Sequence, residues 1–273
     1  MTPYVLIWGG GDLASGVAIR LHRVGIRVLL VEKPQPLAVR RSVSFAQAVY
    51  DGRIQIEDVQ GRLVDNQEGV KTCWENGCVP IIVDPELNIL ESLPALVLID
   101  ARMRKRFYPV SLDLAECVVG LGPGFTAGLN CHVAIETNRG HFLGRVYWEG
   151  NPEADTGIPG QVGAYAAERV LHAPSDGVVE TYVSIGDAVE QGELILSING
   201  EWVRAPFTGV VRGLIHEGLR VDKGTKVGDI DPRPETFRCW FVSEKSLAVG
   251  GGVLEAILTR KAIRNGIWKT LSI

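Results

Sequence analysis

The residues of this chain best suited to chemistry begin with a glycine-rich turn, Gly9-x-Gly11-x-x-Ala14. An apolar run over 4–7 precedes the turn, a helical pattern over 17–24 follows it, and a second apolar run ends on Glu32. Glycines at this spacing let the backbone approach a pyrophosphate, whose charge the N–H groups at the start of the helix attract. A carboxylate after the second run can bind a ribose diol. The pattern predicts a dinucleotide site formed by Gly9, Gly11, Asp12, Ala14 and Glu32.

Two features of the same turn count against this site. Three consecutive glycines over 9–11 make the backbone of the turn more flexible than the dinucleotide pattern requires. Asp12 places a negative charge where the phosphate would lie. Because a fold does not imply a function, the same elements with an empty or altered site are the alternative.

Further apolar segments recur at the spacing of an α/β fold. Together with the runs over 4–7 and 26–31 they give six expected strands, linked by helices or loops. We therefore expect an α/β, Rossmann-like, doubly wound parallel sheet with both faces covered. The four further expected strands are 59–64, 79–83, 95–99 and 116–121.

Polar and reactive side chains concentrate between residues 120 and 160. A second glycine-rich loop over 120–128 follows an expected strand and adds Gly122 and Gly124 to the predicted cofactor site. In one strand register His132 and Glu136 share a face, where they can act as ligand and base, and Cys131 faces the opposite way. Hydrogen-bonded structural roles are the alternative for each histidine. The candidate catalytic residues are Cys131, His132, Glu136 and His141.

Two adjacent arginines, Arg40 and Arg41, lie just past the second expected strand. In a doubly wound sheet this position faces the ligand crevice, where paired guanidinium groups can hold phosphate or another anion. A surface pair near Glu57 and Asp58 is the other interpretation, and the sequence leaves both open.

From residue 172 the chain changes to short strands separated by turn residues, with an internal repeat. The segment 173–179 is echoed by 205–211, and glycines and valines after each copy match at the same offset of 32 residues. The region 172–233 resembles the biotinyl/lipoyl carrier family, a barrel-sandwich hybrid. The hairpin over 197–202, where the carriers hold their modified lysine, has no lysine. We therefore expect an all-β scaffold or docking module and not a carrier.

The expected organisation has four parts. A Rossmann-like nucleotide-binding domain is followed by a polar, glycine-rich connecting segment, by the duplicated β-module and by a C-terminal segment whose helix docks after a flexible glycine joint at 250–252. Their boundaries are 1–125, 126–171, 172–233 and 234–273.

Composition excludes several classes of protein. The formal net charge of −4 favours neither nucleic acid nor an anionic membrane as a partner. No apolar run is long enough to span a bilayer, and no signal peptide is recognisable, so a cytoplasmic protein is expected. The cysteines are odd in number and scattered, which predicts buried, reduced thiols and no disulfide framework. No metal site is predicted.

Several motifs together resemble the YqeB-type accessory proteins of selenium-dependent molybdenum hydroxylases. The resemblance implies a role in maturation of such an enzyme, with the hydroxylase apoenzyme as partner and NAD or a molybdopterin dinucleotide as the bound small molecule. A thiol at Cys131 can in principle handle sulfur or selenium. The motifs that carry the resemblance are 9–16, 40–45, 122–128, 135–141, 156–160 and 250–256.

Two other functions stay open from the sequence. One is an NAD-dependent oxidoreductase that uses the 120–160 segment as its substrate site. The other is a non-catalytic interaction protein with a vestigial nucleotide site.

Overall fold

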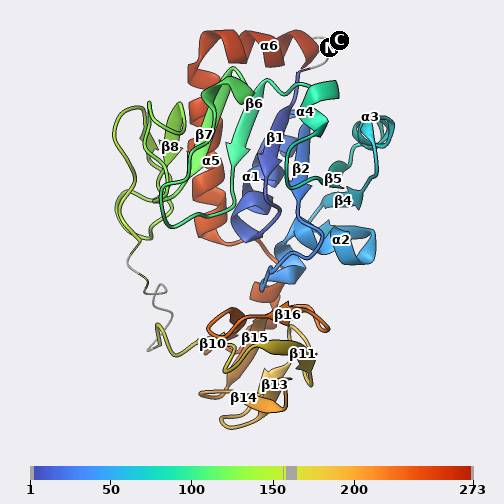
Figure 1. Cartoon of the computed structure of the whole chain (residues 1–273), viewed down its shortest axis with the longest axis vertical. Helices are drawn as coiled ribbons and strands as arrows, with labels where there is room; N and C mark the ends of the chain where they lie inside the picture. Colours follow the sequence, from blue (N-terminus) through green and yellow to red (C-terminus); the bar gives the residue numbers. More distant parts are fainter. Residues whose placement is uncertain (1–2, 156, 158–164, 272–273) are drawn as a thin grey trace. The chain divides into compact units, whose positions relative to one another are not determined.

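The computed structural model describes residues 3–155, 157 and 165–271, and the chain divides into two compact units (Figure 1). The second unit contains a short early segment, Leu37–Ser44, together with Thr156–Phe241. The first unit consists of Met1–Pro36, Phe45–Asp155 and Val242–Ile273.

The first unit is built on a sheet of nine described strands in the order β3-β4-β5-β2-β1-β6-β7-β8-β9. The strands from β4 to β8 are parallel, whereas β3 and β9 pair antiparallel with their neighbours. The inner strands are apolar and almost completely buried, as expected for strands covered on both faces. Their bounds are β1 Val5–Trp8, β2 Val28–Glu32, β3 Arg53–Ile56, β4 Val59–Leu63, β5 Val79–Val83, β6 Val97–Asp100, β7 Cys117–Leu121, β8 Val133–Ile135 and β9 Val146–Tyr147.

Two long helices, α1 and α5, pack against each other in this unit (Figure 1). A Cβ atom at Gly16 would lie 2.4 Å from the Cβ of Ser246, so the two backbones approach closely. The expected joint at 250–252 is instead part of α5. The α-helices are α1 Asp12–Arg23, α2 Ala48–Asp51, α3 Gln67–Glu75, α4 Ile89–Ser92, α5 Glu244–Thr259 and α6 Lys261–Leu271, and the 3-10 turns are η1 Arg41–Val43, η2 Phe45–Gln47, η3 Leu112–Leu114 and η4 Thr236–Cys239.

The second unit holds two antiparallel four-stranded sheets, β10-β17-β15-β12 and β14-β13-β11-β16. Its first three repeat strands, which begin at residues 177, 188 and 194, recur at 209, 220 and 226, so the structure repeats as the sequence does. Each half also gives one short strand to the other sheet, because β12 pairs with β15 and β16 pairs with β11. The bounds are β10 Val170–His172, β11 Gly177–Thr181, β12 Ala188–Val189, β13 Leu194–Ile198, β14 Glu201–Arg204, β15 Gly209–Leu214, β16 Arg220–Val221 and β17 Lys226–Asp231.

The predicted fold class, a doubly wound parallel sheet plus a barrel-sandwich hybrid, is wrong. The large sheet is mixed, because the half-exposed strand β3 forms a hairpin with β4 across Glu57 and Asp58, and Glu57 adopts a positive φ of 53°. The crossovers on either side of β6 carry only a four-residue helix and a three-residue 3-10 turn. The all-β part consists of two separate antiparallel sheets.

The cysteines also differ from expectation. Cys73, at the end of α3, and Cys78, just before β5, form a disulfide, whereas the sequence predicted reduced thiols. Cys117, Cys131 and Cys239 are unpaired and buried, as expected. Within the described residues, no helix is long and apolar enough to cross a membrane.

Candidate functional site

The predicted turn lies directly after β1, at the carboxyl end of the parallel strands. Gly9 has a φ of +104°, which favours glycine, and its N–H donates to the carbonyl of Val31 at 2.8 Å. A Cβ atom at Gly9 would lie 3.3 Å from the carbonyl oxygen of Ala101. The turn is therefore held tightly against the segment that follows β6.

Glu32, at the end of β2, holds the backbone of this turn. Its Oε2 accepts a hydrogen bond from the N–H of Gly10 at 2.7 Å, and its Oε1 accepts one from Lys33 at 2.8 Å. The carboxylate of Glu32 thus holds the backbone of the turn.

The start of α1 is the accessible part of the turn. Gly11 is the N-cap residue of α1, has no side chain to cap the helix, and has open space where a Cβ atom would be. The Oδ1 of Asp12 accepts a hydrogen bond from the Ser246 hydroxyl at 2.8 Å, so this charge is engaged at the start of α5. Ala14 is buried. Backbone N–H groups at the start of a helix can donate to an anion.

A second element lies at the end of β6. The completely buried carboxylate of Asp100 forms a bidentate ion pair with Arg102. The guanidinium carbon of Arg102 lies 3.1 Å from the centre of the Trp8 ring, at the end of β1. This stack joins the ends of two neighbouring strands.

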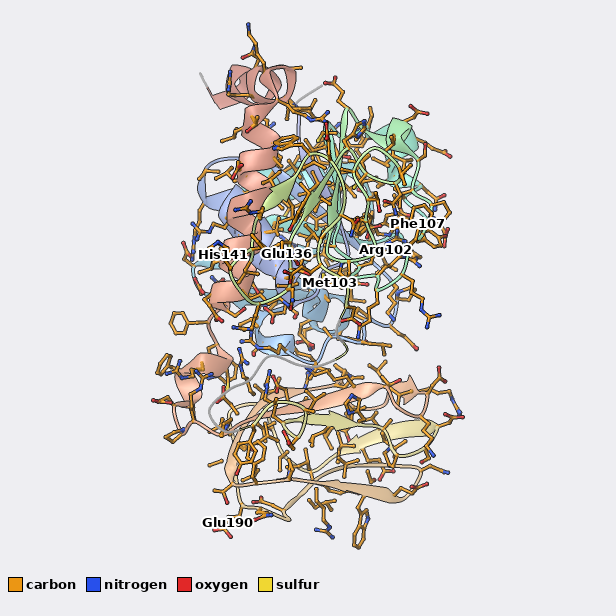
Figure 2. The ribbon with its side chains drawn as sticks, turned by 90° about the vertical axis from the view of Figure 1, so that its left-hand side faces the viewer. Arg102, Met103, Phe107, Glu136, His141 and Glu190 are labelled. Carbon is orange, nitrogen blue, oxygen red and sulfur yellow. A yellow bond between two sulfur atoms is a disulfide. The ribbon has the colours of Figure 1, made fainter. Side chains whose placement is uncertain are left out.

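The second glycine-rich loop packs against the basic segment 102–106. A Cβ atom at Gly122 would lie 2.8 Å from the hydroxyl oxygen of Thr137 and 3.5 Å from the Cε of Met103. One at Gly124 would lie 2.5 Å from the carbonyl oxygen of Arg104. The loops after β1, β6 and β7 therefore converge, and Figure 2 shows Arg102, Met103 and Glu136 at this end of the sheet.

Arg104 carries an unsatisfied donor in this cluster of loops. Its Nε is buried and has no hydrogen-bond partner among the described residues, while its guanidinium carbon lies 3.8 Å from the centre of the Tyr108 ring. A buried donor of this kind costs stability unless a ligand or water meets it. Within this cluster of loops, the Nε of Arg104 is a buried donor that an anionic group can meet.

Glu136 is fully buried just after β8. Its Oε1 accepts hydrogen bonds from the N–H groups of Thr137 at 2.8 Å and Asn138 at 2.7 Å, and its Oε2 accepts one from Glu153 at 2.7 Å. The Glu136 carboxylate therefore accepts three backbone hydrogen bonds, and these join the segment directly after β8 to the segment around Glu153.

The structure does not bring Cys131 and His132 together with Glu136. Both precede β8, whereas Glu136 follows it, so they lie at opposite ends of one strand. The Nδ1 of His132 accepts a hydrogen bond from Val118 at 2.9 Å, and its pKa is lowered by burial and by the charge of Arg260. Burial raises the pKa of Cys131 to about 12. The thiol is protonated and the imidazole is neutral at neutral pH.

The remaining predicted residues lie elsewhere. His141 is exposed in the loop after β8 (Figure 2). Arg40 and Arg41 belong to the second unit, where Arg40 donates to the carbonyls of Arg238 and Phe241, and Arg41 donates to that of Leu214. Both arginines therefore hold the backbone of their own unit.

Sequence reasoning missed the stack of Arg102 on Trp8 and the buried donor of Arg104. The basic run 102–106, directly after a strand that ends on Asp100, was a sequence signal for a cationic loop. The stacking of Arg102 on Trp8 joins residues far apart in the sequence, so no local pattern predicts it. Residues 156 and 158–164 of the polar segment lie outside the described residues. Among those described, no group of three or more His, Cys, Asp or Glu side chains is placed to hold a metal ion.

Comparison with known proteins gives one close sequence similarity. No family model matches the chain. The uncharacterized protein YqeB of Escherichia coli (strain K12) is 44% identical over 254 residues, which are 93% of this chain and 47% of the relative. The chain thus spans about half the length of the relative that it matches. The similarity supports the resemblance to YqeB and leaves the role in enzyme maturation a proposal.

Solved structures show only weak similarity. An aspartoacylase family protein from Mesorhizobium loti has a TM-score of 0.26 at 14% identity, with 86% of each chain covered. A succinylglutamate desuccinylase/aspartoacylase from Rhodobacter sphaeroides has a TM-score of 0.28 at 16% identity, covering 86% of this chain and 87% of that one. Scores this low carry no inference about activity.

Proposed function

We propose that this chain binds a pyrophosphate-bearing dinucleotide, NAD or a molybdopterin dinucleotide, at the loops after β1, β6 and β7. We further propose that it acts as an accessory protein in maturation of a selenium-dependent molybdenum hydroxylase, whose apoenzyme is its partner. The first proposal rests on the geometry of the loops, and the second on the sequence resemblance to YqeB-type proteins.

The buried, unsatisfied Nε of Arg104 is the observation that carries the binding proposal. It belongs to a loop that packs on Gly124 and, through Ala101, on Gly9. The open backbone at Gly11 adds N–H donors of the kind that hold phosphate at helix N-termini. Donors from two neighbouring loops suit a ligand with two linked phosphates.

The candidate catalytic residues support binding rather than catalysis. The thiol of Cys131 is buried with a raised pKa, so it is a poor nucleophile. The Nδ1 of His132 and both carboxylate oxygens of Glu136 already accept backbone hydrogen bonds. An accessory protein that holds a cofactor for another enzyme needs no such nucleophile.

A host that makes a selenium-dependent molybdenum hydroxylase provides the test. Deleting the gene for this chain should leave the hydroxylase polypeptide at normal abundance but without activity, and with less molybdenum and pterin per purified enzyme. Restoring the gene should restore both. A molybdenum enzyme of another class in the same cells is the control and should be unaffected. Normal cofactor content and activity in the deletion strain would contradict the maturation role.

A further inference from the structure

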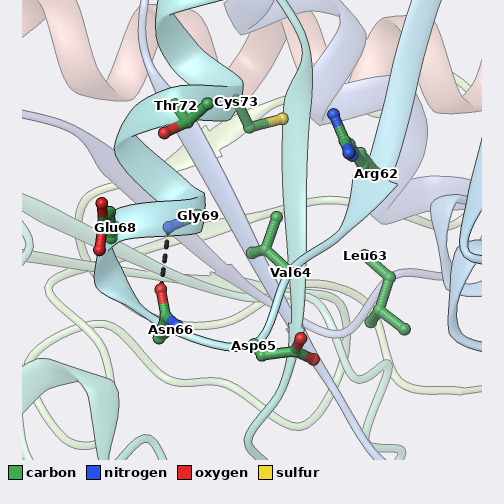
Figure 3. Close-up of a pocket in the computed structure, with 9 residues that line it drawn as sticks. All are labelled: Arg62, Leu63, Val64, Asp65, Asn66, Glu68, Gly69, Thr72 and Cys73. Carbon is green, nitrogen blue, oxygen red and sulfur yellow. Dashed lines mark hydrogen bonds between the residues drawn. The ribbon is translucent and has the colours of Figure 1, made fainter.

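A cavity of about 390 Å³ lies between β4 and α3, and its described lining shares no residue with the loops proposed to hold the dinucleotide. Its described lining comes from the end of β4, the connection to α3 and the first two turns of that helix (Figure 3). The lining residues are Arg62, Leu63, Val64, Asp65, Asn66, Glu68, Gly69, Thr72 and Cys73.

Half of the Cys73–Cys78 disulfide lines this cavity. Cys73 belongs to the lining, whereas Cys78 does not. Figure 3 shows the sulfur of Cys73 pointing away from α3 on the side where Arg62 lies. Both cysteines are otherwise buried, with exposures of 2% and 4%. Cys73 is therefore the cysteine of the pair that the cavity reaches.

The charges around the cavity have both signs. Arg62 supplies a cation, while Asp65 and Glu68 supply two carboxylates, and all three residues are exposed. Asn66 caps α3 by accepting a hydrogen bond from the N–H of Gly69 at 2.9 Å. This mixture suits a small molecule that carries carboxylate and ammonium groups together, and the volume excludes a folded protein domain.

We propose that this cavity is a thiol–disulfide exchange site that admits a small amino-acid thiol, of the glutathione or cysteine class, to the sulfur of Cys73. The site is independent of the dinucleotide site. Cys73 is the attacked cysteine, and Cys78 is the leaving group.

The exchange balances with thiols as the only reductant. The thiolate of the first small thiol attacks the Sγ of Cys73, the Cys73–Cys78 bond breaks, and Cys78 leaves as a thiolate that takes up a proton. The thiolate of a second small thiol then attacks the sulfur of the first small molecule in the mixed disulfide, and Cys73 leaves as a thiolate that takes up a proton. The chain gains two thiols, and the two small molecules become one disulfide.

Trapping distinguishes the two sulfurs. The Cys78→Ser variant, incubated with oxidised glutathione, should gain the mass of one glutathione at Cys73. The matched Cys73→Ser variant, which keeps only Cys78 of this pair, should react at least about tenfold more slowly at that residue, because Cys78 does not line the cavity. Peptide mapping locates the adduct. Equal rates in the two variants, or a faster reaction at Cys78, would overturn the proposal.

A second measurement uses the unmodified chain and does not depend on a variant folding. Reduced glutathione is added to the native protein, and free thiols are alkylated and mapped at successive times. Cys73 and Cys78 should become reactive while Cys117, Cys131 and Cys239 stay protected. Reduction seen only after unfolding in urea, or a chain purified without reductant that holds no Cys73–Cys78 disulfide and does not form it with oxidised glutathione, would contradict the site.

The charge of the ligand can be tested with Arg62→Gln. This change should slow reduction by glutathione about twofold to fivefold, as expected for one exposed ion pair, and leave reduction by uncharged 2-mercaptoethanol unchanged. Lys71→Gln, on α3 but outside the lining, is the matched control and should change neither rate. An equal effect of Arg62→Gln on both thiols would argue against recognition of a charged thiol.

Discussion

At the scale of single residues, the polar side chains at the two ends of β8 accept hydrogen bonds from backbone N–H groups. Alternation along a strand predicts that His132 and Glu136 share a face, and in the structure the two residues flank the three-residue strand β8. Which N–H groups reach each side chain depends on segments distant in sequence, such as Val118 and Glu153. Sequence reasoning found the unusual residues and could not assign their roles.

Replacing Glu136 by Gln should destabilise the first unit. An amide oxygen is a weaker acceptor than a carboxylate, and the amide NH₂ faces backbone donors, so we expect a loss of about 2–4 kcal/mol in the free energy of unfolding. Urea denaturation followed by circular dichroism measures it. Glu149→Gln, on an exposed position, is the control and should stay within about 0.5 kcal/mol. A similar small change for both variants would show that the carboxylate is dispensable.

His132 should be neutral at pH 6.5. Burial and the charge of Arg260 lower its pKa, and its Nδ1 must be unprotonated to accept from Val118. Because the folded pKa lies below the unfolded value of 6.5, this residue stabilises the fold fully above pH 6.5 and loses that contribution as pH falls through the folded pKa. Imidazole nitrogen shifts in NMR spectra report the protonation state. A charged ring at pH 6.5 would contradict the hydrogen bond.

At the scale of elements, the packing of α5 on α1 explains why the sequence pattern around residues 250–252 was misinterpreted as a joint. The three glycines at 250–252 suggest a joint when read alone, because glycine is a poor helix former. In the structure they lie within α5, where a Cβ atom at Gly250 would come within 2.8 Å of the side chain of Arg20 on α1. Close packing explains Gly250, against α1, and Gly252, against the backbone of Gly144, whereas Gly251 has open space around its Cβ position.

The same contact makes Gly16→Ala disruptive. Its Cβ atom would lie 2.9 Å from the backbone carbonyl of Ser246, so the helices must separate, at a cost of about 1–3 kcal/mol. Gly251→Ala, with open space around its Cβ position, is the matched control and should stabilise by up to about 1 kcal/mol through helix propensity. Thermal unfolding of both variants measures the difference. Stabilisation by Gly16→Ala would refute the close approach.

At the scale of the whole molecule, the sequence predicts the inner strands of the sheet well and the edges poorly. The runs at β1, β2, β5, β6 and β7 are continuous and apolar, as fully buried strands must be. The edge strand β3 is short and half exposed, so its pattern is weak. The assignment of Leu37–Ser44 to the second unit depends on long-range contacts such as those of Arg41 with Leu214, which composition does not reveal.

The second unit should lose stability in acid through Asp231. Burial raises the pKa of this carboxyl, but hydrogen bonds and charge from Arg233, together with the charge of Arg212, outweigh burial and hold the pKa below its ordinary value of 3.8. The group therefore stabilises the fold above pH 3.8 and loses that contribution as pH falls through the folded pKa. Asp231→Asn should cost about 2 kcal/mol at neutral pH and flatten this acid dependence. Parallel acid dependences for the two proteins would contradict the ion pairs.

The central claim is that the loops after β1, β6 and β7 hold a pyrophosphate-bearing dinucleotide, and calorimetric titration tests it most directly. The full chain is titrated with NAD and, separately, with molybdopterin dinucleotide released from a molybdenum hydroxylase. Gly11→Val fills the open space at the start of α1 and should raise the dissociation constant at least about tenfold, while Gly251→Val should not change it. Binding of one dinucleotide by the unmodified chain, lost in Gly11→Val, is the predicted result. Binding of neither ligand, or equal binding by Gly11→Val, would contradict the account.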